Sequence, residues 1–112
     1  MNWSVILLGK IVTTEYVLVE TGGLLSRRQD RPTFIALVRE LESDATIEIV
    51  PASKSLFRAG LDLYAKRPDK EWSLVDCISF AVMKQRRLTD ALTADHHFEQ
   101  AGFRALLLTD PD

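Results

Sequence analysis

LVDCISFAVM, residues 74–83, is the stretch that decides the fold, because the helix it predicts is apolar on nearly every side. Such a helix packs inside a protein and not on its surface. Its only charged residue is Asp76. Aspartate is almost never fully buried without a partner, so this side chain needs a hydrogen-bond donor, a cation or a metal ion.

The residue before this stretch offers a second explanation for Asp76. Ser73 stands three residues ahead of it, which is the spacing of a capping box, here with Asp where Glu or Gln is usual. We therefore predict a helix over residues 74–87 that Ser73 caps. Asp76 then either only completes the cap or also faces a ligand.

Outside this helix, short strands are predicted to alternate with helices. The strands are expected at residues 10–14, 46–50, 91–94 and 104–108, and the other helices at 15 to about 28, 31–43, from Ser53 to before Pro68, and from Asp95 to Gln100. Strands separated by helices imply parallel crossovers and a sheet with helices on both faces. In such α/β sheets, ligands bind at the carboxyl ends of the strands.

The length and composition are those of one globular domain spanning residues 1–112. Of these residues 46% are hydrophobic and 27% are charged, which excludes a disordered or low-complexity chain. A net charge of −2 provides no general attraction to nucleic acid, so RNA would need a local basic cluster. Lys84, Arg86 and Arg87 are the best candidates for phosphate contacts, although charges at a helix end are also typical of a solvated end.

The single cysteine and the short apolar runs indicate the compartment. Cys77 has no second cysteine to pair with and lies in an apolar run, so we interpret it as a packing residue. The longest apolar stretches, 5–8 and 105–108, are far below the roughly 20 residues of a membrane span. The sequence therefore predicts a cytoplasmic protein that does not bind membranes.

Two further carboxylates lie at the end of a predicted strand or at the edge of the buried face of a predicted helix. Asp95 follows a predicted strand, where it either caps a helix or faces a ligand, and Glu20 lies at the edge of an apolar helical arc, where it is either solvated or part of a site. Carboxylates that converge with Asp76 at one sheet edge would repel each other unless a divalent cation bound there. Mg²⁺ suits such oxygen donors.

The histidines and tryptophans give weaker indications of a functional site. His96 and His97 are adjacent and have no second His or Cys pair at ligand spacing, so they make a poor tetrahedral zinc site. Trp3 and Trp72 are interpreted as core or interface residues because no basic and aromatic interleaving surrounds them.

Three segments together resemble the later motifs of PIN-domain nucleases, especially VapC-like toxins. They are TTEYVLVE (13–20), WSLVDCISF (72–80) and LTADHHF (92–98). The resemblance implies a PIN-like three-layer α/β/α sandwich with a mostly parallel sheet and an RNA-hydrolysing activity that uses Mg²⁺ or Mn²⁺. Carried over by position, Glu20, Asp76 and Asp95 are three of the metal-binding acids, and Ser73 matches the hydroxyl residue before the third acid. A small antitoxin and a homodimer are the implied partners.

The chain departs from that family at its start. PIN domains begin with a central strand that ends in an aspartate, and nothing before Lys10 matches it. The sequence thus resembles an N-terminally truncated domain, and two functions stay open: a VapC-like metal-dependent endoribonuclease, or a degenerate, non-catalytic PIN module that keeps only the fold and partner binding. Residues 5–8 resemble a strand, but only Gly9 and Lys10 separate them from the next one, whereas a parallel crossover takes a dozen residues or more. We therefore expect a second copy to supply the missing strand, or an intertwined dimer.

Overall fold

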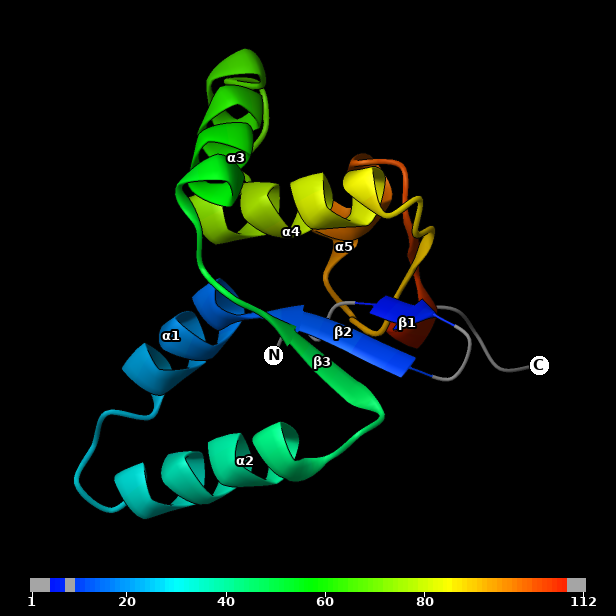
Figure 1. Ribbon diagram of the computed structural model, residues 1–112. Coiled ribbons are helices and arrows are strands. Elements are labelled where there is room, and N and C mark those ends of the chain that lie inside the picture. The colour runs from blue at the N-terminus through cyan, green and yellow to red at the C-terminus, as the bar shows by residue number, and fades with distance from the viewer. Residues whose placement is uncertain (1–4, 8–9, 109–112) are drawn as a thin grey trace.

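The computed structural model describes residues 5–7 and 10–108, which form a five-stranded sheet and five α-helices (Figure 1). The strands are β1 (Val5–Leu7), β2 (Lys10–Thr14), β3 (Ile47–Val50), β4 (Asp90–Ala91) and β5 (Arg104–Ala105). The helices are α1 (Glu15–Leu24), α2 (Arg31–Ser43), α3 (Lys54–Lys66), α4 (Leu74–Gln85) and α5 (His96–Gln100), and a 3₁₀ turn (Leu106–Leu108) follows β5.

The sheet has the order β3-β2-β1-β4-β5 and is mostly parallel. β2 pairs in parallel with β3, β4 pairs in parallel with β5, and only β1 runs antiparallel to its neighbours. In Figure 1, α2 lies on one side of the sheet, and α4 and α5 lie on the other. The predicted α/β/α class is confirmed.

The central strand corrects our expectation about the middle of the sheet. β1 bridges β2 and β4 within one chain, with Val5 opposite both Val12 and Ala91. The argument against residues 5–8 excluded only a parallel position, because a short link between neighbouring strands permits an antiparallel hairpin. The gap that motivated a strand from a second copy is therefore closed in this structure. Gly9, in the link, lies outside the described residues.

Several helices and strands begin or end at other residues than the sequence predicts. The first helix ends at Leu24 and not near 28, the strand expected at 91–94 is Asp90–Ala91, and the one expected at 104–108 is Arg104–Ala105. Three apolar residues in a row, Leu106–Leu108, form a 3₁₀ turn, in which the backbone N–H of Leu107 donates to the carbonyl oxygen of Thr93 at 3.1 Å. The strand at 46–50 begins at Ile47, and the helix expected to reach 87 ends at Gln85.

Helix α4 is the centre of the core, as its composition predicts. Seven of its residues are buried, and the five apolar ones contribute to two apolar clusters. One cluster joins α4 to α5 and β4 through Phe80, Phe98 and Ala91, and the other joins it to β2, β3 and α3 through Ile78 and Val82. Among the described residues no helix combines the length and apolarity needed to cross a membrane.

A close helix pair fixes the orientation of α4. Gly60 of α3 is buried, and a Cβ atom added there would lie 3.1 Å from the backbone Cα of Ile78. Only glycine lets the two helices approach this closely. This close approach sets the position of α4 against α3.

Candidate acidic site

The N-terminus of α4 places Asp76 at the edge of the core. The predicted capping box is present: the backbone N–H of Asp76 donates to Ser73 Oγ at 3.0 Å, and the backbone N–H of Ser73 donates to Asp76 Oδ2 at 3.1 Å. Only 5% of Asp76 is exposed. The cap is therefore real, but it does not account for all contacts of this carboxylate.

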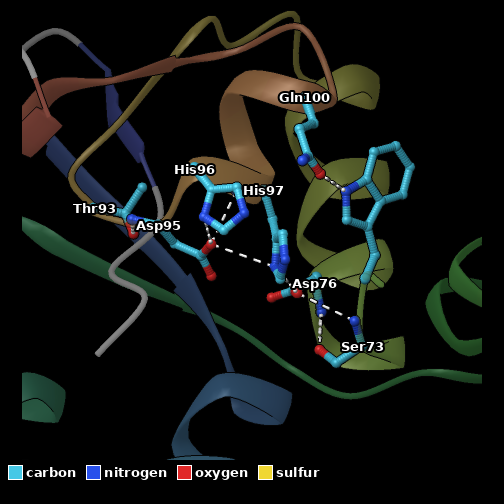
Figure 2. Close-up of polar contacts among 8 residues, drawn as sticks. Ser73, Asp76, Thr93, Asp95, His96, His97 and Gln100 are labelled. Carbon is cyan, nitrogen blue, oxygen red and sulfur yellow. Dashed lines mark hydrogen bonds and ion pairs between the residues drawn. The ribbon is translucent and has the colours of Figure 1, made fainter. Parts of the chain in front are cut away.

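The additional contact comes from His97, in the first turn of α5. Its Nδ1 atom lies 3.3 Å from Asp76 Oδ2 and 3.3 Å from Asp95 Oδ1 (Figure 2). Asp95 caps α5, since the backbone N–H of His97 donates to Asp95 Oδ1 at 2.9 Å. Both carboxylates thus take part in a helix cap, and both also lie beside the same imidazole.

Aromatic packing is what brings α5 to this position. The ring of Phe98 meets Phe80 of α4 edge to face, with 4.8 Å between ring centroids, and the indole N–H of Trp72 donates to Gln100 at 3.1 Å. These contacts hold the middle of the short helix against α4 and its last residue against Trp72, which precedes α4. His97 precedes Phe98, so the same packing turns its ring toward Asp76. Trp72 is a core residue, as predicted.

Glu20 lies within electrostatic reach of the other two acids. It sits on α1, which packs against α4. The pKa of its carboxyl is raised, first by partial loss of solvent and then by the negative charges of Asp76 and Asp95. Glu20 is itself an exposed residue, and the charges of Asp76 and Asp95 act on its carboxyl. We call Glu20, Asp76, Asp95 and His97 the acidic site.

The donor set fits a divalent cation. Carboxylate oxygens are the donors that Mg²⁺ and Mn²⁺ prefer, and imidazole adds a nitrogen donor. Donor atoms of Asp95, His96 and His97 also lie within 4.8 Å of one another. However, the His96 side chain is 67% exposed, and its Nδ1 is 4.0 Å from Asp95, so His96 is the peripheral member of this group.

The other predicted residues lie elsewhere or have structural roles. Lys84, Arg86 and Arg87 are at the opposite end of α4 from Asp76, and Arg86 makes two hydrogen bonds to Glu48, at 2.7 and 2.8 Å. The structure therefore does not bring this basic cluster to the acidic site. Cys77 is fully buried, and burial followed by the nearby Asp76 charge raises the pKa of its thiol, in agreement with a packing role.

His97 is the residue that sequence reasoning missed. His96 and His97 have no second His or Cys pair at zinc spacing, so the sequence pattern did not indicate a site at His97. The sequence did contain one signal. His97 stands two residues after Asp95, and at that position of a helix the backbone N–H donates to the side chain of a capping aspartate. Its contact with Asp76, 21 residues away, depends on tertiary packing.

The fold is an α/β/α sandwich with a mostly parallel sheet, a class of proteins in which ligands bind at the carboxyl ends of the strands. The profile of the PIN-domain family matches residues 2–104. The chain belongs to the PIN-domain family.

Curated relatives and a solved structure narrow the resemblance. The chain is 33% identical over 94 residues to the 23S rRNA-specific endonuclease VapC20 of Mycobacterium tuberculosis strains CDC 1551 and H37Rv, a match that covers 83% of this chain and 70% of the relative. The crystal structure of M. tuberculosis VapC20, a toxin that cleaves the sarcin–ricin loop, is similar with a TM-score of 0.76 and 27% identity, over 85% of this chain and 72% of the other. The predicted resemblance to VapC-like toxins is confirmed.

Proposed function

We propose that this protein is an endoribonuclease of the VapC toxin type that hydrolyses RNA phosphodiesters with a divalent cation, Mg²⁺ or Mn²⁺, held at the acidic site. The observation that supports it most directly is the meeting of Asp76 and Asp95 at one imidazole, with Glu20 near enough for their charges to raise its pKa. The similarity to a 23S rRNA-specific endonuclease supplies the substrate class.

In this proposal each residue has a distinct role. Asp76 and Asp95 bind the cation, and Glu20 binds it through water or orients the attacking water. Ser73 fixes the Asp76 carboxylate through the capping box. A bound cation of this kind polarises a phosphoryl oxygen and lowers the pKa of a bound water.

Two partner interactions belong to the same proposal. The VapC resemblance supports a small antitoxin that covers the acidic site, and it supports a homodimer. Val19 and Leu24 on α1 are 75% and 78% exposed, and Ile35 on α2 is 49% exposed. Apolar side chains of this size are typical of surfaces that bind another chain. Light scattering at micromolar concentration tests the dimer, and a monomer would contradict it.

The test of the activity is cleavage of a structured RNA, with a sarcin–ricin loop oligonucleotide as the first substrate. Purified protein is incubated with Mg²⁺ or Mn²⁺, with an EDTA control. We expect cleavage that EDTA abolishes and that Asp76→Asn and Asp95→Asn each abolish. Asp62→Asn is the matched control, because it removes an exposed carboxylate on α3 that lies outside the acidic site.

Two other results would contradict the proposal. Cleavage that is unchanged in both site variants would come from a contaminant. A folded wild-type protein that cleaves no RNA, under conditions where a complete PIN nuclease is active, would favour the non-catalytic PIN module.

A further inference from the structure

Three arginines lie close together in sequence where α1 is joined to α2. Arg27, Arg28 and Arg31 fall within five consecutive residues, and all three are exposed. Among the residues that the structure describes, none of the three forms an ion pair with a carboxylate. In the basic cluster at the end of α4, by contrast, Arg86 is paired with Glu48. We call Arg27, Arg28 and Arg31 the arginine turn.

Hydrogen bonds within the chain hold the arginine turn in one shape. The backbone N–H groups of Asp30 and Arg31 both donate to the carbonyl oxygen of Arg27, at 2.9 and 3.1 Å. The side-chain Nε of Arg31 also donates to the carbonyl oxygen of Ser26 at 2.8 Å. Asp30 is the only acidic residue between the arginines, so the segment keeps an excess of positive charge. Its backbone is already ordered, and binding a polyanion would therefore cost mainly side-chain freedom.

Helix α1 connects the arginine turn to the acidic site. Figure 1 shows the connection between α1 and α2 at the end of α1 that points away from the sheet. Glu20 lies on α1, four residues before the helix ends at Leu24, and Arg27 follows three residues later. Four helical residues and three extended ones span at most about 17 Å. A nucleic-acid strand carries one phosphate per about 3.4 Å, so about five nucleotides cover this distance.

Phosphate is the ligand that this surface fits. A guanidinium group is always charged and presents a planar fork of donors that matches the oxygens of a phosphate. The net charge of −2 provides no general attraction to RNA, so a local group of cations has to supply it. We infer that the arginine turn binds backbone phosphates of the RNA substrate, within about five nucleotides of the acidic site. This inference rests on the proposed function, which favours RNA over an acidic protein as the partner.

The test measures RNA binding by the full chain in EDTA, where the proposed cleavage does not proceed. A fluorescent sarcin–ricin loop oligonucleotide is titrated with protein at several salt concentrations, and its anisotropy gives the affinity. Each phosphate contact contributes about 0.7–0.9 to the slope of log affinity against log salt. Replacing all three arginines by glutamine should therefore lower the magnitude of that slope by about 2–3 and weaken binding about 10–100-fold at low salt. The variant combines Arg27→Gln, Arg28→Gln and Arg31→Gln.

Two matched variants separate the arginine turn from net charge and from folding. Replacing the same three arginines by lysine keeps the charges, so most of the salt dependence should remain. A control on α3 changes the net charge by the same amount as the glutamine variant and should bind RNA as wild type does. It removes three exposed cations of that helix through Lys54→Gln, Arg58→Gln and Lys66→Gln. Circular dichroism checks that each variant is folded.

Cleavage kinetics give a second readout in Mg²⁺ or Mn²⁺. The arginine turn lies outside the acidic site, so the glutamine variant should raise KM and leave kcat nearly unchanged. A lower kcat with an unchanged KM would contradict a role in binding.

The outcomes distinguish this inference from the proposed function. A glutamine variant with wild-type affinity and slope would overturn the inference and leave an acidic protein as the partner of this surface, while RNA cleavage by the wild type would still support the proposed function. An equal loss of binding in the α3 control would also overturn it, because net charge would then explain the attraction. A lysine variant that binds as weakly as the glutamine variant would exclude contacts made through charge. A folded wild-type protein that neither binds nor cleaves RNA would overturn both proposals.

Discussion

The two ends of α4 handle charge in opposite ways. At the N-terminal end, Asp76 and Asp95 both lie beside His97, and the pKa of Glu20 is raised first by partial loss of solvent and then by the charges of these two acids. At the C-terminal end, Arg86 is held by two hydrogen bonds to Glu48. Carboxylates therefore gather at the N-terminal end of α4, whereas at the C-terminal end an arginine pairs with a glutamate. Keeping several carboxylates close together lowers the stability of the fold, but such a cluster can bind a ligand of opposite charge. An ion pair instead stabilises the fold.

The largest expected effect is at Asp76. Asp76→Asn should reduce metal-dependent RNA cleavage by more than the about 10–100-fold that is typical of losing a group supporting a metal ligand. The helix should remain, because the asparagine oxygen can still accept from the Ser73 N–H. Cleavage rate and Mn²⁺ binding are the measurements.

The paired variant Ser73→Ala separates the cap from the site. It should lower the free energy of unfolding by about 1 kcal/mol, the usual cost of losing such a cap, and should affect cleavage less than Asp76→Asn does. If Ser73→Ala reduced cleavage as much as Asp76→Asn, the aspartate would act mainly as a cap.

The close packing of α3 against α4 should be the next most sensitive feature. Gly60→Ala places a Cβ against Ile78 of α4 and should cost about 1–3 kcal/mol in the free energy of unfolding by urea. Gly23→Ala is the control: its added Cβ meets no atom within 4 Å, and it should stabilise α1 by about 0.5–1 kcal/mol. Equal effects of the two substitutions would show that α3 and α4 are not closely packed.

The third prediction concerns the accumulated charge itself. Because the pKa of Glu20 is raised in the folded protein above its usual value of 4.5, ionisation opposes folding. The destabilisation is absent below pH 4.5, develops as pH rises toward the raised pKa, and is complete above it. In EDTA at neutral pH, Glu20→Gln should therefore melt at a higher temperature than wild type. An unchanged or lower melting temperature would contradict the raised pKa of Glu20, which loss of solvent and the charges of Asp76 and Asp95 together produce.

The smallest effect is expected at the basic end. Arg86 and Glu48 are each about one-third exposed, with side-chain values of 35% and 34%, and exposed ion pairs contribute about 0.2–1 kcal/mol. A double-mutant cycle with Arg86→Ala and Glu48→Gln should give a coupling energy in this range. Neither substitution should change Mn²⁺ binding at the acidic site. A change in metal affinity would show that the two ends are coupled.

By itself the sequence determined the local features of this protein. The burial of α4 follows from its apolar composition, and the caps at Ser53, Ser73 and Asp95 follow from short-range hydrogen bonding within one helical turn. The resemblance to the PIN family could also be recognised there, because its motifs are contiguous. These features depend on residues a few positions apart, which a linear pattern records.

The tertiary structure alone decided how the distant parts meet. Sequence spacing excluded a parallel β1 but did not predict an antiparallel one, because pairing direction depends on which strand edges are available. Likewise, nothing local places His97 beside Asp76: that contact follows from Phe98 packing on Phe80, which sets α5 against α4. Long-range packing thus converted two helix caps into one site that faces a shared imidazole.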